Sequence, residues 1–265
     1  MREVHLQTDG QTLLGKLLPP EGPGPFPGAL FVHGWGATQR HDLAKARRLT
    51  RLGFACLTFN LRGHARTRDQ VETVSRAHNF RDALAAYDLL AADEVVDAAR
   101  MAIAGVSYGG YLGTLLTLER PVRWLALQSP AIYKDGDFDR PKRELNLDGE
   151  LPQYRRMRLA PEDNRVLAAA ARFTGDVLLV EAERDTVIPA PVAANYLEAF
   201  RRSAASLTHR IIAGADHALS EDRWRRQHGV LLARWFAERI GLPQRRVADA
   251  VGARSARIAR RAGPR

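Results

Sequence analysis

The segment MAIAGVSYGG, residues 101–110, joins an apolar run to a serine that is enclosed by glycines. Ser107 directly follows the apolar run, and Gly105, Gly109 and Gly110 flank it. A strand that turns sharply into a helix uses nearby glycines to make room and leaves the side chain at its tip exposed. The segment therefore predicts a strand–turn–helix unit that presents Ser107, if other segments supply a base, an acid and a place to bind an oxyanion.

The rest of the chain alternates short apolar runs with helical patterns. Strands are expected at 4–8, 13–20, 29–34, 55–61, 100–107, 122–130, 176–183 and 207–214, and helices at 39–52, 79–92, 108–119, 191–202 and 221–240. The first two strands are separated by an Asp-Gly turn, which predicts a hairpin. The pattern predicts an α/β fold with a mostly parallel, eight-stranded sheet and helices on both faces.

The bulk composition is that of a soluble globular protein, with 265 residues, 45% hydrophobic and 26% charged. A single cysteine, Cys56, excludes an intramolecular disulfide and a cysteine-based metal site. The first residues lack the apolar stretch of a signal peptide, and no apolar run is as long as a membrane span. We therefore expect a cytoplasmic protein.

The net charge of +10 is concentrated at one end of the chain, because residues 241–265 contain seven arginines and one aspartate. The remaining charge is ordinary for a soluble domain and disfavours nucleic acid as a partner. The basic segment 243–265 is the one candidate for such binding, and it is expected to be flexible.

Two further polar residues follow the last strands of the predicted sheet, where ligands bind in folds of this type. Asp185 comes after the strand at 176–183, with Glu183 as a competitor, and His217 comes after the strand at 207–214. A serine nucleophile needs a histidine base, which in turn needs a carboxylate to orient it.

The loop FVHGWGA, residues 31–37, follows another buried strand. A backbone N–H from this loop can pair with the N–H of Tyr108 to bind an oxyanion.

Taken together, these motifs resemble the α/β-hydrolase superfamily over nearly all of residues 4–240. The resemblance implies that Ser107 is the nucleophile, His217 the base and Asp185 the orienting acid. It also implies that Trp35 and Tyr108 supply the backbone N–H groups of the oxyanion hole.

The chain is most similar to small serine esterases of the dienelactone-hydrolase and cinnamoyl-esterase-like groups. The segment NLRGHAR, residues 60–66, departs from the D-x-R-G-x-G pattern of the superfamily. Asn60 replaces the usual aspartate and Ala65 the usual glycine, which puts the geometry of this loop in doubt.

The resemblance implies a hydrolase domain at 1–240 and a basic tail at 241–265, with residues 131–160 as a short, polar cap insertion. Such a cap favours short-chain or aromatic esters over long-chain lipids, so a small-molecule ester is the expected substrate. No metal or organic cofactor is expected, and the oligomeric state stays open. A thioesterase, a peptidase or a perhydrolase on the same residues remains an alternative, as does a binding protein without catalytic activity.

Overall fold

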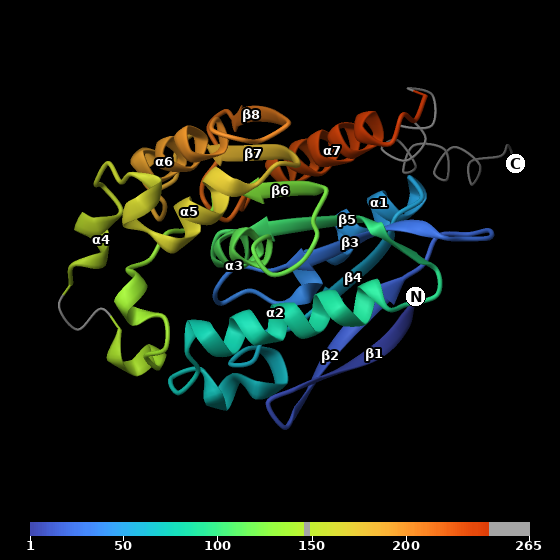
Figure 1. The fold of residues 1–265 in the computed structure, drawn as a ribbon, viewed down its shortest axis with the longest axis horizontal. Coiled ribbons are helices and arrows are strands. Elements are labelled where there is room, and N and C mark those ends of the chain that lie inside the picture. Colours follow the sequence, from blue (N-terminus) through green and yellow to red (C-terminus); the bar gives the residue numbers. More distant parts are fainter. Residues whose placement is uncertain (146–148, 244–265) are drawn as a thin grey trace, which may run out of the picture.

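A computed structural model describes residues 1–145 and 149–243 (Figure 1). Part of the expected cap, residues 146–148, and most of the expected tail, residues 244–265, lie outside this description. None of the described helices combines the length and the apolar character that a membrane-spanning segment requires.

The strands form one eight-stranded sheet in the order β1-β2-β4-β3-β5-β6-β7-β8. Their bounds are β1 Arg2–Thr8, β2 Gln11–Leu18, β3 Phe26–Val32, β4 Ala55–Phe59, β5 Val96–Val106, β6 Trp124–Gln128, β7 Asp176–Ala182 and β8 Ser206–Ile212. The pairs β1/β2 and β2/β4 are antiparallel and all other pairs are parallel. The prediction of a hairpin followed by a mostly parallel sheet is therefore confirmed.

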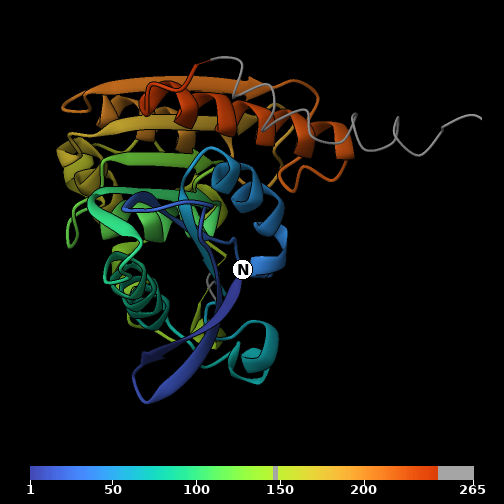
Figure 2. The ribbon, with the colours of Figure 1, turned by 90° about the vertical axis from the view of Figure 1, so that its right-hand side faces the viewer.

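The helices form a layer on each face of the sheet (Figure 2). Their bounds are α1 Leu43–Arg51, α2 Arg76–Ala91, α3 Tyr108–Leu116, α4 Leu151–Tyr154, α5 Arg165–Arg172, α6 Ala190–Phe200 and α7 Asp222–Arg239. Residues of α1 and α7 belong to one apolar core, and residues of α2, α3, α5 and α6 belong to the other. Because both faces are covered, the central strands β4 and β6 are buried at every position and read as continuous apolar runs.

Two elements differ from the expectations. The helix expected at 39–52 is divided into a short turn, Gln39–His41, and α1. The side chain of Gln39 bonds to the Leu14 carbonyl and accepts a hydrogen bond from Thr58, so this residue is fixed to the sheet. The helix α5 was missed because its segment, RVLAAAAR, has few large apolar residues; its start is nevertheless capped by Asn164, which accepts the N–H of Val166.

Candidate active site

Ser107 occupies the sharp turn between β5 and α3 that the sequence predicts. Its backbone has φ 51° and ψ −111°, a conformation that is strained for any residue with a Cβ. Its N–H donates to the Gln128 carbonyl at 2.8 Å, and its carbonyl accepts the N–H of Ala131 at 3.0 Å. These bonds to the neighbouring strand end hold the strained turn in place.

The glycines around Ser107 are required by close backbone contacts. A Cβ on Gly109 would lie 2.0 Å from the Val32 carbonyl oxygen, and one on Gly105 would lie 2.6 Å from the Gly109 carbonyl oxygen. Both distances are far below van der Waals contact with backbone atoms that cannot move aside. The glycines therefore allow α3 to begin directly against β3 and β5.

His217 connects Ser107 to Asp185. Its Nε2 lies 3.1 Å from the Ser107 Oγ, and its Nδ1 lies 2.7 Å from the Asp185 Oδ2. The three residues come from the loops after β5, β7 and β8, and the structure brings them together at the carboxyl edge of the sheet as their positions predict. This is the geometry in which a histidine accepts a proton from a serine while a carboxylate orients it.

The second oxygen of Asp185 is held by the backbone of its own loop. The Asp185 Oδ1 accepts the N–H of Val187 at 2.9 Å and of Ile188 at 2.7 Å. Burial by itself would raise the pKa of Asp185, but its hydrogen bonds with His217 and Ile188 outweigh burial and keep the pKa below its usual value. The carboxylate therefore stays ionised beside the imidazole. These two donors were not predicted from the sequence, although an aspartate followed by a tight loop commonly bonds to the next N–H groups.

Glu183, the alternative acid, points elsewhere. Its Oε2 accepts the N–H of Gly214 at 2.7 Å, and the residue is exposed. Asp185 is thus the carboxylate that contacts His217.

The loop that carries Trp35 passes directly beside Ser107. A Cβ on Gly34, the residue before Trp35, would lie 3.5 Å from the Cβ of Ser107. The rings of Trp35 and Tyr108 pack edge to face with centroids 5.3 Å apart. The two proposed oxyanion donors therefore belong to segments that flank Ser107, and their role stays a prediction.

His64 contacts this loop at Gly36 and Trp35. Its Nε2 accepts the N–H of Gly36 at 3.1 Å, and its ring packs against that of Trp35 with centroids 4.8 Å apart. Burial, together with the neighbouring His33 and Lys142, lowers the pKa of His64 to about 4. The ring is therefore neutral and can act as an acceptor.

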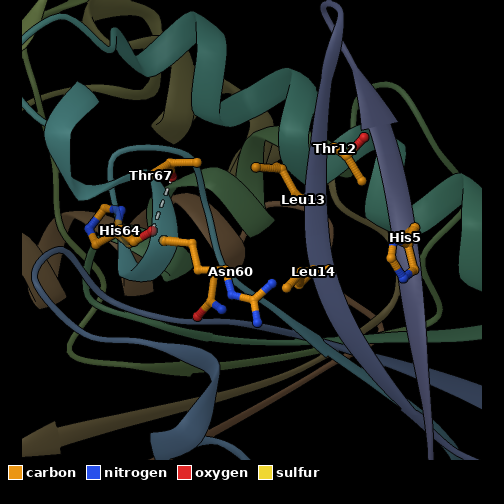
Figure 3. A pocket seen from close by; sticks show the side chains of 8 residues that line it. His5, Thr12, Leu13, Leu14, Asn60, His64 and Thr67 are labelled. Carbon is orange, nitrogen blue, oxygen red and sulfur yellow. Dashed lines mark hydrogen bonds between the residues drawn. The ribbon is translucent and has the colours of Figure 1, made fainter.

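A pocket of about 270 Å³ has His64 in its lining (Figure 3). It is lined by His5, Thr12, Leu13, Leu14, Asn60, His64, Arg66 and Thr67. None of the three residues Ser107, Asp185 and His217 lines it, so it is separate from the candidate active site.

The two departures in the loop after β4 have different consequences. Asn60 accepts the N–H of Gln39 with its Oδ1 at 3.0 Å, so the amide still anchors the segment before α1. Ala65 has φ 50°, a value that glycine adopts without strain, so its methyl group makes this turn more strained than the usual glycine would.

Within residues 1–145 and 149–243, no group of three or more histidine, cysteine, aspartate or glutamate side chains is placed to hold a metal ion. Cys56 is free and fully buried, and burial raises the pKa of its thiol to about 12.

Several solved structures share this fold at low sequence identity. Est1E from Butyrivibrio proteoclasticus, a structure with bound ferulic acid, superposes with a TM-score of 0.68 at 19% identity, covering 90% of this chain and 99% of that one. Dienelactone hydrolase from Anabaena variabilis gives a TM-score of 0.64 at 17% identity, covering 89% of this chain and 96% of that one. A puromycin-hydrolyzing peptidase from Mycobacterium tuberculosis gives 0.66 at 22% identity, covering 91% of this chain but 39% of that one.

These similarities confirm the α/β-hydrolase fold. No curated protein sequence matches the chain significantly. The model of the prolyl oligopeptidase family matches residues 41–242, a range that includes Ser107, Asp185 and His217. This match covers most of the chain, and the strand order and the sharp turn at Ser107 agree with it. The chain belongs to the prolyl oligopeptidase family of α/β-hydrolases.

Proposed function

We propose that the protein is a serine hydrolase that cleaves carboxylic esters with short-chain or aromatic acyl groups. The proposal rests above all on the position of His217, which lies within hydrogen-bond distance of both Ser107 and Asp185. A binding protein without turnover would have no need for this arrangement.

In the proposed reaction, the Ser107 Oγ attacks the ester carbonyl while the His217 Nε2 takes its proton. The oxyanion that forms accepts hydrogen bonds from the N–H groups of Trp35 and Tyr108. His217 then gives the proton to the departing alcohol, which leaves an acyl group on Ser107. A water molecule, deprotonated by His217, hydrolyses this acyl-enzyme, and Asp185 stabilises the imidazolium in both steps.

The short and aromatic acyl groups are proposed from the surroundings of Ser107. The described part of the segment 131–160 contains short turns and a single helical turn, α4, and no long apolar helix to cover a lipid chain. Aromatic rings lie close to the nucleophile, since Trp35 and Tyr133 both pack against Tyr108.

A peptidase is the second candidate, and the family match favours it. The same groups attack an amide, with His217 protonating a leaving amine instead of an alcohol. Aminoacyl and N-acylaminoacyl p-nitroanilides, assayed beside the corresponding esters, separate the two: a peptidase turns over both series, and an esterase only the esters.

The first test is hydrolysis of p-nitrophenyl acetate, butyrate, octanoate and palmitate. We expect rates that fall with chain length, and a loss of at least about four orders of magnitude in kcat for Ser107→Ala. A fluorophosphonate probe should label the wild type and leave Ser107→Ala unlabelled. Wild-type rates in the variant would show that another group is the nucleophile.

The role of Asp185 is tested against the matched acid Glu183. Asp185→Asn should lower kcat by roughly 10³–10⁴-fold, because the amide no longer holds the histidine in the required tautomer. Glu183→Gln should retain kcat close to that of the wild type, since Glu183 bonds to Gly214 and not to His217. The reverse order of the two effects would exclude Asp185 as the orienting acid.

A further inference from the structure

The residue that follows the nucleophile lies between two further aromatic side chains. Trp35 packs edge to face on Tyr108 from the β3 loop, with centroids 5.3 Å apart, and Tyr133 packs on it from the segment after β6, with centroids 5.8 Å apart. The three rings form a row beside Ser107, here called the aromatic row.

Three cationic side chains cover this row. The Lys142 Nζ lies 4.0 Å from the centroid of the Trp35 ring, and the guanidinium carbons of Arg76 and Arg155 lie 4.3 Å and 5.1 Å from that of Tyr133. They come from separate parts of the chain, since Arg76 begins α2 and the other two belong to the segment 131–160.

Within the described residues, none of these three cations forms an ion pair with a carboxylate. Arg76 donates one hydrogen bond, to the Asp137 carbonyl, and Arg155 donates to the carbonyls of Ile132 and Val187. Glu72 is the acid whose charge reaches Lys142, from beyond ion-pair distance.

Other arginines of the same region behave differently. Arg140, Arg158 and Arg165 each pair with an aspartate or a glutamate. Among the described residues Arg156 also has no ion pair, but it is exposed and donates to the Pro152 carbonyl, so it differs from the partly buried cations that surround the aromatic row.

Burial makes these charges more effective than surface charges. Arg76 is only 4% exposed. Lys142 is half-buried, and burial lowers the pKa of its ammonium group below the usual range. A partly desolvated cation without a counterion interacts strongly with an anion that enters beside it, because water screens the pair less.

We infer that the active site selects substrates that carry a carboxylate within a few atoms of the scissile carbonyl, and that Lys142 binds this carboxylate, with Arg155 and Arg76 at Tyr133 adding to the positive charge. The inference rests on the proposed function, since it names the substrate class of the same site. Lys142 acts here as a specificity-determining residue, and Ser107, His217 and Asp185 carry the reaction.

The test compares matched pairs of esters that differ only in charge. On the acyl side, p-nitrophenyl hydrogen glutarate is compared with its methyl ester, and on the leaving-group side 4-acetoxybenzoate is compared with methyl 4-acetoxybenzoate. We expect kcat/KM for the anionic member to exceed that of the neutral member about tenfold in at least one pair, which corresponds to about 1.4 kcal/mol. The preference should weaken as ionic strength rises.

Variants of two adjacent residues locate the effect. Lys142→Met should bring the ratio close to one, and Lys142→Arg should restore most of it. Arg143→Met removes an equal charge from the next residue, whose side chain is 62% exposed, and should retain the wild-type ratio. An unchanged ratio in Lys142→Met, or a neutral preference in both pairs of the wild type, would overturn the inference.

Neutral esters keep this test separate from that of the proposed function. If the wild type hydrolyses them and Ser107→Ala does not, the proposed function holds whatever the charge preference. If no ester is turned over, calorimetry with glutarate still decides: binding to the wild type that is lost in Lys142→Met supports the carboxylate site, and no binding to the wild type refutes it.

Discussion

The ring of His64 links the loop at Trp35 to the pH dependence of stability. It is 5% exposed and accepts the N–H of Gly36, which it can do only as a neutral imidazole. Its pKa falls from 6.5 to about 4 in the folded protein, mainly because the ring is buried. The perturbation that tests this is His64→Phe, which keeps an aromatic ring against Trp35 and removes the acceptor.

The expected magnitude follows from the two pKa values. Between pH 6.5 and about 4 the unfolded chain binds a proton at His64 that the folded protein does not, so the free energy of unfolding decreases as the pH falls. Each pH unit of difference corresponds to about 1.4 kcal/mol, so His64 accounts for about 3 kcal/mol over this window. His64→Phe should remove this contribution, so that its stability falls less steeply with pH than that of the wild type.

Urea unfolding followed by tryptophan fluorescence at pH 4.5, 5.5, 6.5 and 7.5 measures the effect. At pH 7.5 the variant should be less stable by about 1 kcal/mol, because the N–H of Gly36 loses its acceptor. His5→Phe is the matched control: it removes an exposed histidine from the same pocket and should leave the slope as in the wild type. Parallel pH profiles for His64→Phe and the wild type would show that His64 does not cause the loss of stability at low pH.

Three further perturbations test other parts of the fold. Gly109→Ala should prevent soluble expression or cost more than about 3 kcal/mol in urea unfolding, since its Cβ would overlap the Val32 carbonyl at 2.0 Å. Arg62→Met should cost about 3–5 kcal/mol because it leaves the fully buried Asp82 without its cation, and adding Asp82→Asn should recover part of the loss. Burial beside two cations lowers the pKa of His228 to about 3, so the wild type loses stability as the pH falls below about 6.5. His228→Leu removes this group and should therefore make unfolding less sensitive to acid.

The sheet and the meeting of Ser107, Asp185 and His217 at its edge could be predicted because the relevant signals are local. The central strands are mostly apolar runs, and Ser107, Asp185 and His217 follow the ends of β5, β7 and the edge strand β8. Parallel strands end at one edge, so positions far apart in sequence can be placed together without knowledge of any contact. Both Glu183 and Asp185 follow the end of β7 at Ala182, so their contacts distinguish them: Asp185 contacts His217 and Glu183 bonds to Gly214, while the role of Asp185 stays a prediction.

Other features depend on contacts that no local pattern records. The helix α5 is built largely of alanine and is identified by its packing on α3 and α6. The bond from Gly36 to His64 joins loops 28 residues apart. Lys142 reaches Trp35 because the segment around it pairs with residues before α2, through the Lys142 N–H and the Val74 carbonyl. Such long-range contacts decide the chemistry around Ser107, and periodicity does not reveal them.

A chain of polar contacts connects the first hairpin to the turn at Ser107. Asp9, at the hairpin turn, pairs with Arg62 at 2.9 Å, and Arg62 pairs with Asp82 at 2.6 Å. Asn79 donates to Asp82 at 3.2 Å and accepts the hydroxyl hydrogen of Tyr108 at 3.0 Å.

Every member of this series of contacts except Asp9 is buried, so the bonds among the buried members are strong and costly to break. It fixes the Tyr108 side chain, and with it the start of α3, before any substrate arrives. In the proposed reaction the N–H of Tyr108 binds the oxyanion, and a donor that is already in place needs no reorganisation when charge develops. A buried ion pair remote from Ser107 would thus contribute to the rate as well as to stability, and Arg62→Met should lower kcat more than it changes KM.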